Sequence, residues 1–187
     1  MTTLKVHNIE SAPEGSKALL ENSQKSFGMI PSLHGVLAGS PQVLEAYQTL
    51  HELFTQSSFN EEELTVVWQT INVEHACHYC VPAHTGIAKM MKVDDEITEA
   101  LRNETPLENA KLEALRTMTL SIVRNRGNVS QEDLDAFYAA GYGEAQVLDI
   151  ILGLSQKTIS NYVNHIAHTP VDAPFQKFAW SKDTVVS

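Results

Sequence analysis

The residues best suited to chemistry lie in one short stretch, residues 74–84, whose sequence is EHACHYCVPAH. Cys77 and Cys80 form a C-x-x-C pair, and His84 follows Cys80 by four residues. In a helix, residues four apart lie one turn apart on the same face, so the ring of His84 would lie within reach of the Cys80 sulfur. A thiolate is a far better nucleophile than a thiol, and a helix N-terminus stabilises that anion. A neighbouring imidazole can take up the thiol proton and later act as an acid toward a leaving group.

The second thiol extends this chemistry to a redox cycle. At this spacing one cysteine can attack the oxidised sulfur of the other and close a disulfide without a large backbone movement. These groups suit attack on the O–O bond of a peroxide: one sulfur becomes a sulfenic acid, the other resolves it, and an external reductant restores the dithiol. Glu74 adjoins the pair and is the candidate for orienting the imidazole or passing protons to water.

Composition limits what else the chain can do. With 187 residues, 43% of them hydrophobic, the chain can form one domain with a real core. Thirteen Lys and Arg against 23 Asp and Glu give a net charge of −10, so we expect no nucleic-acid partner and no electrostatic membrane docking. No apolar run approaches the roughly 18 residues of a membrane span. The first ten residues lack a signal-peptide pattern, and two cysteines are too few for a secreted disulfide scaffold, so we expect a cytoplasmic protein.

The elements that must position the motif are helices. Alternating strand patterns are nearly absent, and helix starts are predicted at Ser40-Pro41, at a capping box of Asn60 and Glu63, at a capping box in Thr105-Pro106-Leu107-Glu108, at Ser130 and at about Glu144. One helix is predicted from Asn60 to about Glu74 and the next from near Cys77 to Met91. We therefore predict a single all-α domain over residues 1–187 with roughly seven to nine helices, in which 1–13 and 171–187 are arms.

The stretch 74–84, together with the capped acidic helix Glu61–Ile71 before it and the segment Ile159–Ile166 (ISNYVNHI) near the end, resembles the AhpD-like or carboxymuconolactone decarboxylase-like family. The resemblance covers roughly residues 40–168 and favours the branch described as peroxidase-related. It implies an AhpD-like helical bundle that assembles as a homo-oligomer (dimer, trimer or hexamer). It also implies reduction of a small hydroperoxide with a thiol or dithiol reductant, without a cofactor or a metal. In this family Cys80 would attack, Cys77 would resolve, and His84 would relay protons.

The chain departs from the family pattern at the relay carboxylate. That carboxylate lies twelve residues before the first cysteine, where this chain has Thr65. Glu63 is two residues away, about 200° round a helix, so it cannot take over the position. Glu74 is therefore the better candidate for a relay. Tyr79 also stands where AhpD carries a histidine, and His78 comes one position earlier.

The sequence is also compatible with two other functions. A lactone-acid decarboxylase would need an acid–base pair but no cysteine pair. A redox-sensing or zinc-binding helical oligomer would use Cys77, Cys80 and His84, with His75 or His78 as a fourth ligand, although the chain has no distal Cys/His pair of the usual spacing.

Overall fold

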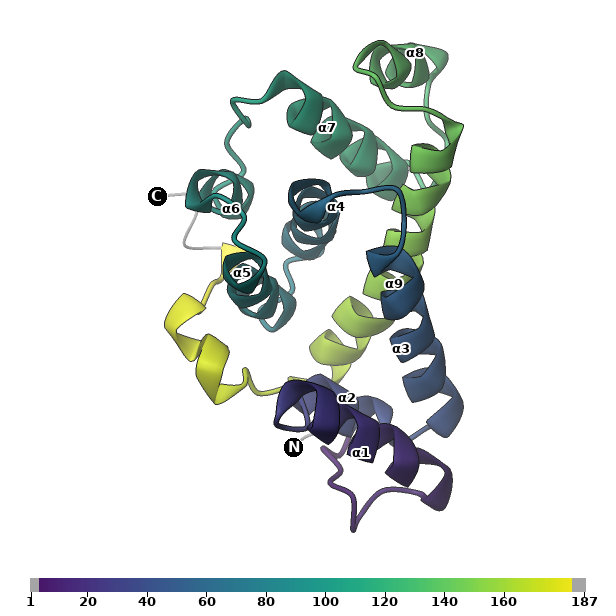
Figure 1. The fold of residues 1–187 in the computed structure, drawn as a ribbon, viewed down its shortest axis with the longest axis vertical. Helices are drawn as coiled ribbons and strands as arrows, with labels where there is room; N and C mark the ends of the chain where they lie inside the picture. Colours follow the sequence, from purple (N-terminus) through teal and green to yellow (C-terminus); the bar gives the residue numbers. More distant parts are fainter. Residues whose placement is uncertain (1–3, 183–187) are drawn as a thin grey trace.

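The computed structural model describes residues 4–182, and this part of the chain is helical without any strand (Figure 1). It contains α1 (Glu14–Phe27), α2 (Ser32–Leu37), α3 (Pro41–Thr55), α4 (Glu61–Glu74), α5 (Cys80–Met90), α6 (Asp95–Arg102), α7 (Ala110–Arg124), α8 (Gln131–Ala139), α9 (Glu144–Ala167) and the 3-10 helix η1 (Ala173–Phe178). The predicted all-α class is confirmed. The number of helical segments slightly exceeds the predicted range, because α2 and η1 have only six residues each and leave little periodic pattern.

Local capping chemistry sets several of these boundaries. The capping box of α4 is present as predicted: the Asn60 side chain accepts from the Glu63 N–H at 3.0 Å, and the Glu63 carboxylate accepts from the Asn60 N–H at 3.1 Å. The capping box predicted at residues 105–108 is wrong. Asn109 caps α7 instead, and the Leu107 N–H donates to the Glu113 carboxylate at 2.8 Å, so this N–H is satisfied by a side chain of α7 rather than inside a helix.

The central element is α4, which Figure 1 shows between α5, α6, α7 and α9. All of its residues from Glu63 to Val73 are buried. Its apolar side chains, with Trp68 and Ile71 among them, form the main core together with α7 and α9. A second apolar cluster joins α1, α2 and α3 to the start of α5 and includes both cysteines.

The 24-residue helix α9 crosses the domain and packs against α3 and α4. A Cβ atom at Gly153 would lie 2.8 Å from the Phe54 ring, so glycine is needed for the close approach of α9 to α3. The C-terminal half of α9 also buries a set of polar side chains: Gln156, Lys157, Ser160, Asn161 and Asn164. Buried polar groups are stable only when they have partners, so this half of α9 is built for polar contacts inside the domain.

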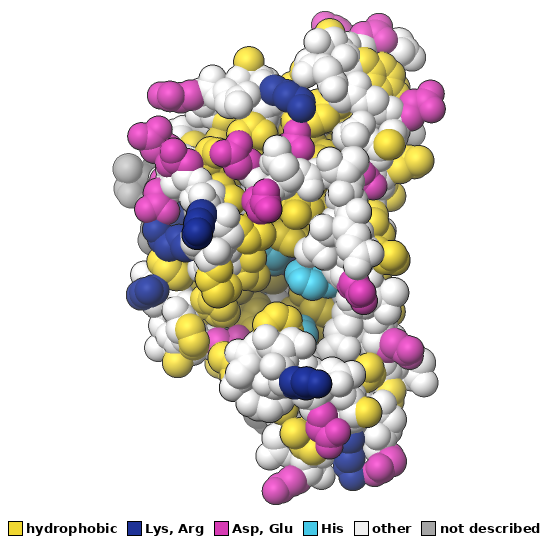
Figure 2. Space-filling view, viewed as in Figure 1, with side chains coloured by type: hydrophobic (Ala, Val, Ile, Leu, Met, Phe, Trp, Pro, Cys, Tyr) yellow, Lys and Arg dark blue, Asp and Glu magenta, His cyan; other side chains and the backbone are white. Residues whose placement is uncertain are grey.

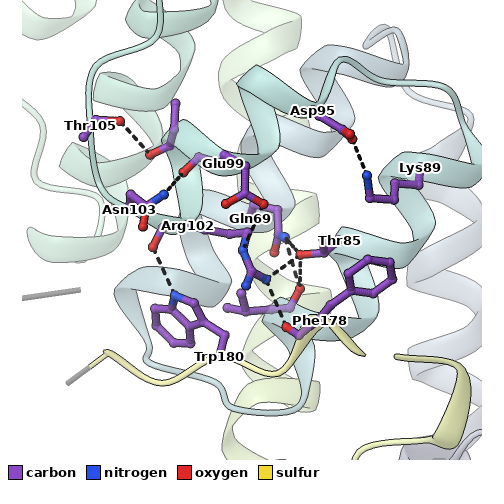
Figure 3. A network of polar contacts seen from close by, with 12 residues as sticks. Gln69, Thr85, Lys89, Asp95, Glu99, Arg102, Asn103, Thr105, Phe178 and Trp180 are labelled. Atoms are coloured by element: carbon purple, nitrogen blue, oxygen red, sulfur yellow. Dashed lines mark hydrogen bonds and ion pairs between the residues drawn. The ribbon is translucent and has the colours of Figure 1, made fainter. Parts of the chain in front are cut away.

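The predicted C-terminal arm packs on α5 and α6 as far as residue 182. Arg102 of α6 donates to the Thr85 hydroxyl at 2.9 Å and to the Phe178 carbonyl at 3.1 Å, while the Trp180 indole donates to the Arg102 carbonyl at 3.0 Å (Figure 3). At the predicted N-terminal arm, the His7 N–H donates to the Gly35 carbonyl at 2.9 Å. Residues 1–3 and 183–187 of the two arms lie outside the described residues. No helix within residues 4–182 is long and apolar enough to cross a membrane.

Candidate active site

The cysteine pair lies where α4 turns into α5. The helix start predicted near Cys77 is observed three residues later: α5 begins at Cys80, and Tyr79 is its N-cap residue, without a side-chain capping bond. Cys77 accepts the Cys80 N–H with its sulfur at 3.2 Å and the Val81 N–H with its carbonyl at 3.1 Å. The Cys77 sulfur thus satisfies the N–H of the first helical residue, which has no partner inside the helix. Cys80 is the first residue of the helix.

The two thiols are free, and both are almost completely buried. The Asn164 side-chain nitrogen lies 3.2 Å from the Cys80 sulfur and 4.0 Å from the Cys77 sulfur. Burial by itself raises the pKa of the Cys80 thiol, but the hydrogen bond from the Cys77 thiol, the charge of Lys157 and the Asn164 amide outweigh it, so the pKa is lowered. Burial and the neighbouring Cys80 sulfur raise the pKa of Cys77. Cys80 is therefore the sulfur favoured as a thiolate, and Cys77 is the protonated thiol.

A cavity of about 580 Å³ opens beside this pair, between α1, α2, α3, α5, α9 and η1. Figure 2 shows a hollow in which histidine side chains lie among hydrophobic ones. Cys80 lines the cavity, whereas Cys77 is not among the described residues of its wall. Most of the wall is apolar; the titratable side chains that line it are His34, Tyr47, His51, Tyr79, Cys80, His84 and Lys157. Of the two thiols, a substrate in this cavity would therefore meet that of Cys80.

His84 lies one helical turn after Cys80 and lines the same cavity, as the spacing predicts. Its hydrogen-bond partner is Lys157, whose Nζ atom lies 2.9 Å from Nε2 of the imidazole. Burial, the Lys157 charge and His51 lower the pKa of His84 well below its ordinary range, so the imidazole is neutral at neutral pH. Its Nδ1 atom is buried and has no hydrogen-bond partner among the described residues. One ring nitrogen is thus still available for a further hydrogen bond.

Glu74 lies in the last turn of α4, and its carboxylate is engaged on the surface. Both carboxylate oxygens accept hydrogen bonds from the Arg124 guanidinium of α7, at 2.9 and 2.7 Å. This contact is the main cause of the lowered pKa of Glu74. Among the described contacts none joins Glu74 to either cysteine or to His84, so the structure does not bring this predicted residue into the cavity. Thr65, which stands at the position of the family's relay carboxylate, is buried and donates to the Glu61 carbonyl at 2.8 Å.

The other residues of the motif hold neighbouring segments. His75 pairs through Nδ1 with the Asn161 side-chain oxygen at 2.9 Å, His78 pairs with the Thr169 carbonyl at 3.0 Å, and the Tyr79 hydroxyl donates to Asp172. Within residues 4–182 no three His, Cys, Asp or Glu side chains are grouped so that they could hold a metal ion. The geometry therefore gives no support to the zinc site considered from the sequence.

Two residues of the site were not identified from the sequence: Lys157 and Asn164, both on α9. They follow Ile150 by 7 and 14 residues, so a helical period of 3.6 places them on its buried face. The available signal was a lysine on the apolar face of a helix, a position where lysine is rare unless it is paired.

No family model and no curated protein sequence matches the chain. Solved structures do match it. An AhpD-core, uncharacterized peroxidase-related protein from Ralstonia eutropha JMP134 has a TM-score of 0.80 and 16% identity over 93% of this chain and 94% of that one. A peroxidase-related protein from Silicibacter sp. TM1040 has a TM-score of 0.78 and 17% identity over 93% of each chain. The debrominase Bmp8, in complex with 2,3,4-tribromopyrrole, has a TM-score of 0.77 and 14% identity over 99% and 98%. The chain therefore has the AhpD-like all-helical fold, as its cysteine motif predicts.

Proposed function

We propose that the protein is a thiol peroxidase of the AhpD-like, peroxidase-related type, which reduces hydroperoxides through a dithiol–disulfide cycle of Cys80 and Cys77. One observation carries the proposal. Of the two sulfurs, the one that lines the cavity is also the one that its neighbours favour as a thiolate. The nucleophile and the space for a substrate therefore coincide at Cys80.

The cycle has two chemical steps. The Cys80 thiolate attacks the outer oxygen of ROOH, so an S–O bond forms, the O–O bond breaks and the inner oxygen leaves as ROH after it takes up a proton. Cys77 then attacks the sulfur of the Cys80 sulfenic acid, so an S–S bond forms and the hydroxyl leaves as water with the Cys77 proton. An external thiol or dithiol reduces the disulfide. Each turnover moves two electrons from the thiols to the peroxide.

The position of Cys77 suits the resolving step. Its sulfur is held at the N-terminus of α5, 3.2 Å from the Cys80 backbone nitrogen. The Asn164 side-chain nitrogen lies within 4.0 Å of both sulfurs. The raised pKa of Cys77 keeps its thiol protonated until the sulfenic acid forms on Cys80, so the proton needed to release water is present at the site.

Thiol labelling before and after hydroperoxide tests the assignment in the parent protein and in Cys77→Ser and Cys80→Ser. We expect each equivalent of hydroperoxide to remove two free thiols from the parent. Cys77→Ser should lose one thiol and accumulate a sulfenic acid that a dimedone-type probe traps at Cys80. Cys80→Ser should consume no peroxide, and consumption at the parental rate would refute the assignment.

A second function, reductive dehalogenation, is favoured by the size and lining of the cavity. About 580 Å³ with a mostly apolar wall is far more space than hydrogen peroxide needs and is enough for a substituted aromatic ring. Bmp8, which shares the fold, is a debrominase. The balance would be R–Br plus two thiols giving R–H, HBr and a disulfide. Release of bromide from a bromopyrrole faster than reduction of an alkyl hydroperoxide would favour this function over the peroxidase.

We also propose that the protein forms a homo-oligomer and that it is cytoplasmic. Several large apolar side chains of α9 are exposed on the single chain: Leu148, Ile151, Tyr162 and Ile166. A second subunit would remove such side chains from water. Light scattering coupled to size-exclusion chromatography tests this, and a monomer at micromolar concentration would contradict it.

A further inference from the structure

Lys157 is a buried lysine at the candidate active site. Its side chain is 1% exposed, it lines the cavity with Cys80, and its Nζ atom lies 2.9 Å from Nε2 of His84. Among residues 4–182 no carboxylate forms an ion pair with it. A buried ammonium group without an anion is unstable relative to the neutral amine. Lys157 therefore either loses its proton or has an anionic partner inside the domain.

The groups that face Lys157 limit that partner to a sulfur. They are His84 and Cys80 of α5, Cys77 of the turn before α5 and His51 of α3, and none of them is a carboxylate. The two histidines are neutral or positive and cannot balance the charge. Of the two thiols, Cys80 accepts from the Asn164 amide at 3.2 Å and begins a helix, and both features stabilise an anion. The Cys80 thiolate is therefore the partner that the site provides.

We propose that Lys157 is a catalytic residue that pairs with the Cys80 thiolate in the resting enzyme and then donates its proton to the leaving oxygen of the hydroperoxide. This proposal rests on the peroxidase function proposed above. An ammonium group has three N–H donors, and one is used by His84. Two therefore remain, one for the thiolate and one for an oxygen in the cavity. His84 acts through Lys157, by holding the ammonium group in place.

The proton balance closes over one turnover. The resting site holds Cys80 as a thiolate, Lys157 as an ammonium ion and Cys77 as a thiol. When the S–O bond forms and the O–O bond breaks, the departing RO⁻ takes a proton from Lys157 and leaves as ROH. The Cys77 proton leaves with the hydroxyl as water when the disulfide closes. Reduction of the disulfide by an external thiol regenerates the Cys80 thiol, whose proton returns to the Lys157 amine.

Two measurements on Lys157 variants separate the effect of its positive charge on the Cys80 thiolate from the transfer of its proton to the leaving oxygen. The first is the pH midpoint of iodoacetamide alkylation of Cys80 in a Cys77→Ser background, which uses no peroxide. The second is the rate of reduction of tert-butyl hydroperoxide and of peracetic acid, whose carboxylate leaving group needs no proton. The variants are Lys157→Met, Lys157→Gln and Lys157→Arg, and exposed Lys5→Met is the control. Lys157→Gln keeps a donor for His84 without the charge, so it replaces Lys157→Met should that variant not fold.

We expect the neutral variants to raise the alkylation midpoint by at least about one pH unit, a tenfold loss of thiolate at lower pH. Lys157→Arg should keep the low midpoint, because the positive charge remains. Since arginine does not release its proton, this variant should reduce tert-butyl hydroperoxide about 10²- to 10⁴-fold more slowly, while peracetic acid is affected much less. Lys5→Met should match the parent in both assays.

An unchanged midpoint in a folded neutral variant would overturn the ion pair. A parental rate of Lys157→Arg with tert-butyl hydroperoxide would overturn the proton transfer. A parent that consumes neither peroxide would instead refute the peroxidase function and, with it, the proton step. The alkylation midpoints would still decide whether Lys157 holds the Cys80 thiolate.

Discussion

Asn164→Leu measures how much the α9 amide contributes to the Cys80 thiolate. The Asn164 side-chain nitrogen lies 3.2 Å from the Cys80 sulfur, and the side chain is fully buried. Leucine has a similar volume and cannot donate a hydrogen bond, so the substitution removes the donor and leaves the packing nearly intact. The affected quantity is the pKa of the Cys80 thiol, which its neighbours lower.

The size of the effect follows from the charge of the acceptor. A hydrogen bond to a charged group contributes about 1.5–3 kcal/mol, and about 1.4 kcal/mol corresponds to one pKa unit. Because the donor stabilises the anion, its removal raises the pKa of Cys80 by about 1–2 units, toward the value of about 8.5 for a free cysteine. Below both midpoints the thiolate fraction falls tenfold per unit. Alkylation there should slow about 10- to 100-fold.

The assay is the rate of iodoacetamide alkylation of Cys80 as a function of pH, in a Cys77→Ser background. Asn125→Leu is the matched control, since it makes the same chemical change at the exposed C-terminus of α7. It should leave the midpoint unchanged. The reasoning fails if folded Asn164→Leu has the midpoint of its parent, because the amide would then contribute nothing to the anion.

Three further predictions concern the surroundings of the site. Glu74→Gln should leave peroxide reduction unchanged, because Arg124 engages this carboxylate, and a loss of activity would support a relay role. The substitution should lower the free energy of unfolding by about 0.5 kcal/mol above pH about 4.3, and this difference should vanish as the pH falls through the lowered pKa of Glu74. Asp172→Ala removes three hydrogen bonds to α2 and the α4–α5 turn, so it should lower the free energy of unfolding, measured by urea denaturation, by about 2–4 kcal/mol. An unchanged free energy of unfolding would show that these groups bond equally well with water. Gly86→Ala places a Cβ atom 2.5 Å from the Phe175 ring and should lower the free energy of unfolding by about 1–3 kcal/mol, part of which a second substitution, Phe175→Leu, should recover. A double variant no more stable than Gly86→Ala would contradict the clash.

Helix boundaries were predictable where the capping contacts are local. The reciprocal bonds of Asn60 and Glu63 join residues three apart, so the sequence alone contains both partners. The start of α7 was misplaced because the predicted capping box at residues 105–108 is not formed, and the Leu107 N–H is satisfied six residues further on, by Glu113. The helix η1 follows no periodic pattern; it is held through Phe178, whose carbonyl accepts from Arg102 of α6.

In the candidate site, too, contacts between neighbours in the sequence were predictable and contacts between distant segments were not. Cys77, Cys80 and His84 lie within eight residues, so helix geometry alone places the imidazole one turn from the second sulfur. Lys157 reaches His84 across 73 residues and Asn164 reaches Cys80 across 84, and such packing is invisible to local pattern analysis. Glu74 shows the converse case. Its place next to the motif suggested a relay, but the last turn of α4 directs its carboxylate to Arg124.

Within the motif, the two cysteines differ only in their spacing from His84, and tertiary structure adds the other differences between them. Resemblance to a family assigned attack to Cys80, but the structure supplies a physical basis that does not depend on it. The Cys77 sulfur accepts the Cys80 N–H away from the cavity wall, while Cys80 lines the cavity together with Lys157 and receives the Asn164 donor. If the order of attack were reversed, the substrate would have to reach a sulfur that does not line the cavity and whose pKa is raised. The position of the cavity and the lowered pKa of Cys80 therefore support the proposed order, Cys80 then Cys77, for any electrophile that the cavity admits.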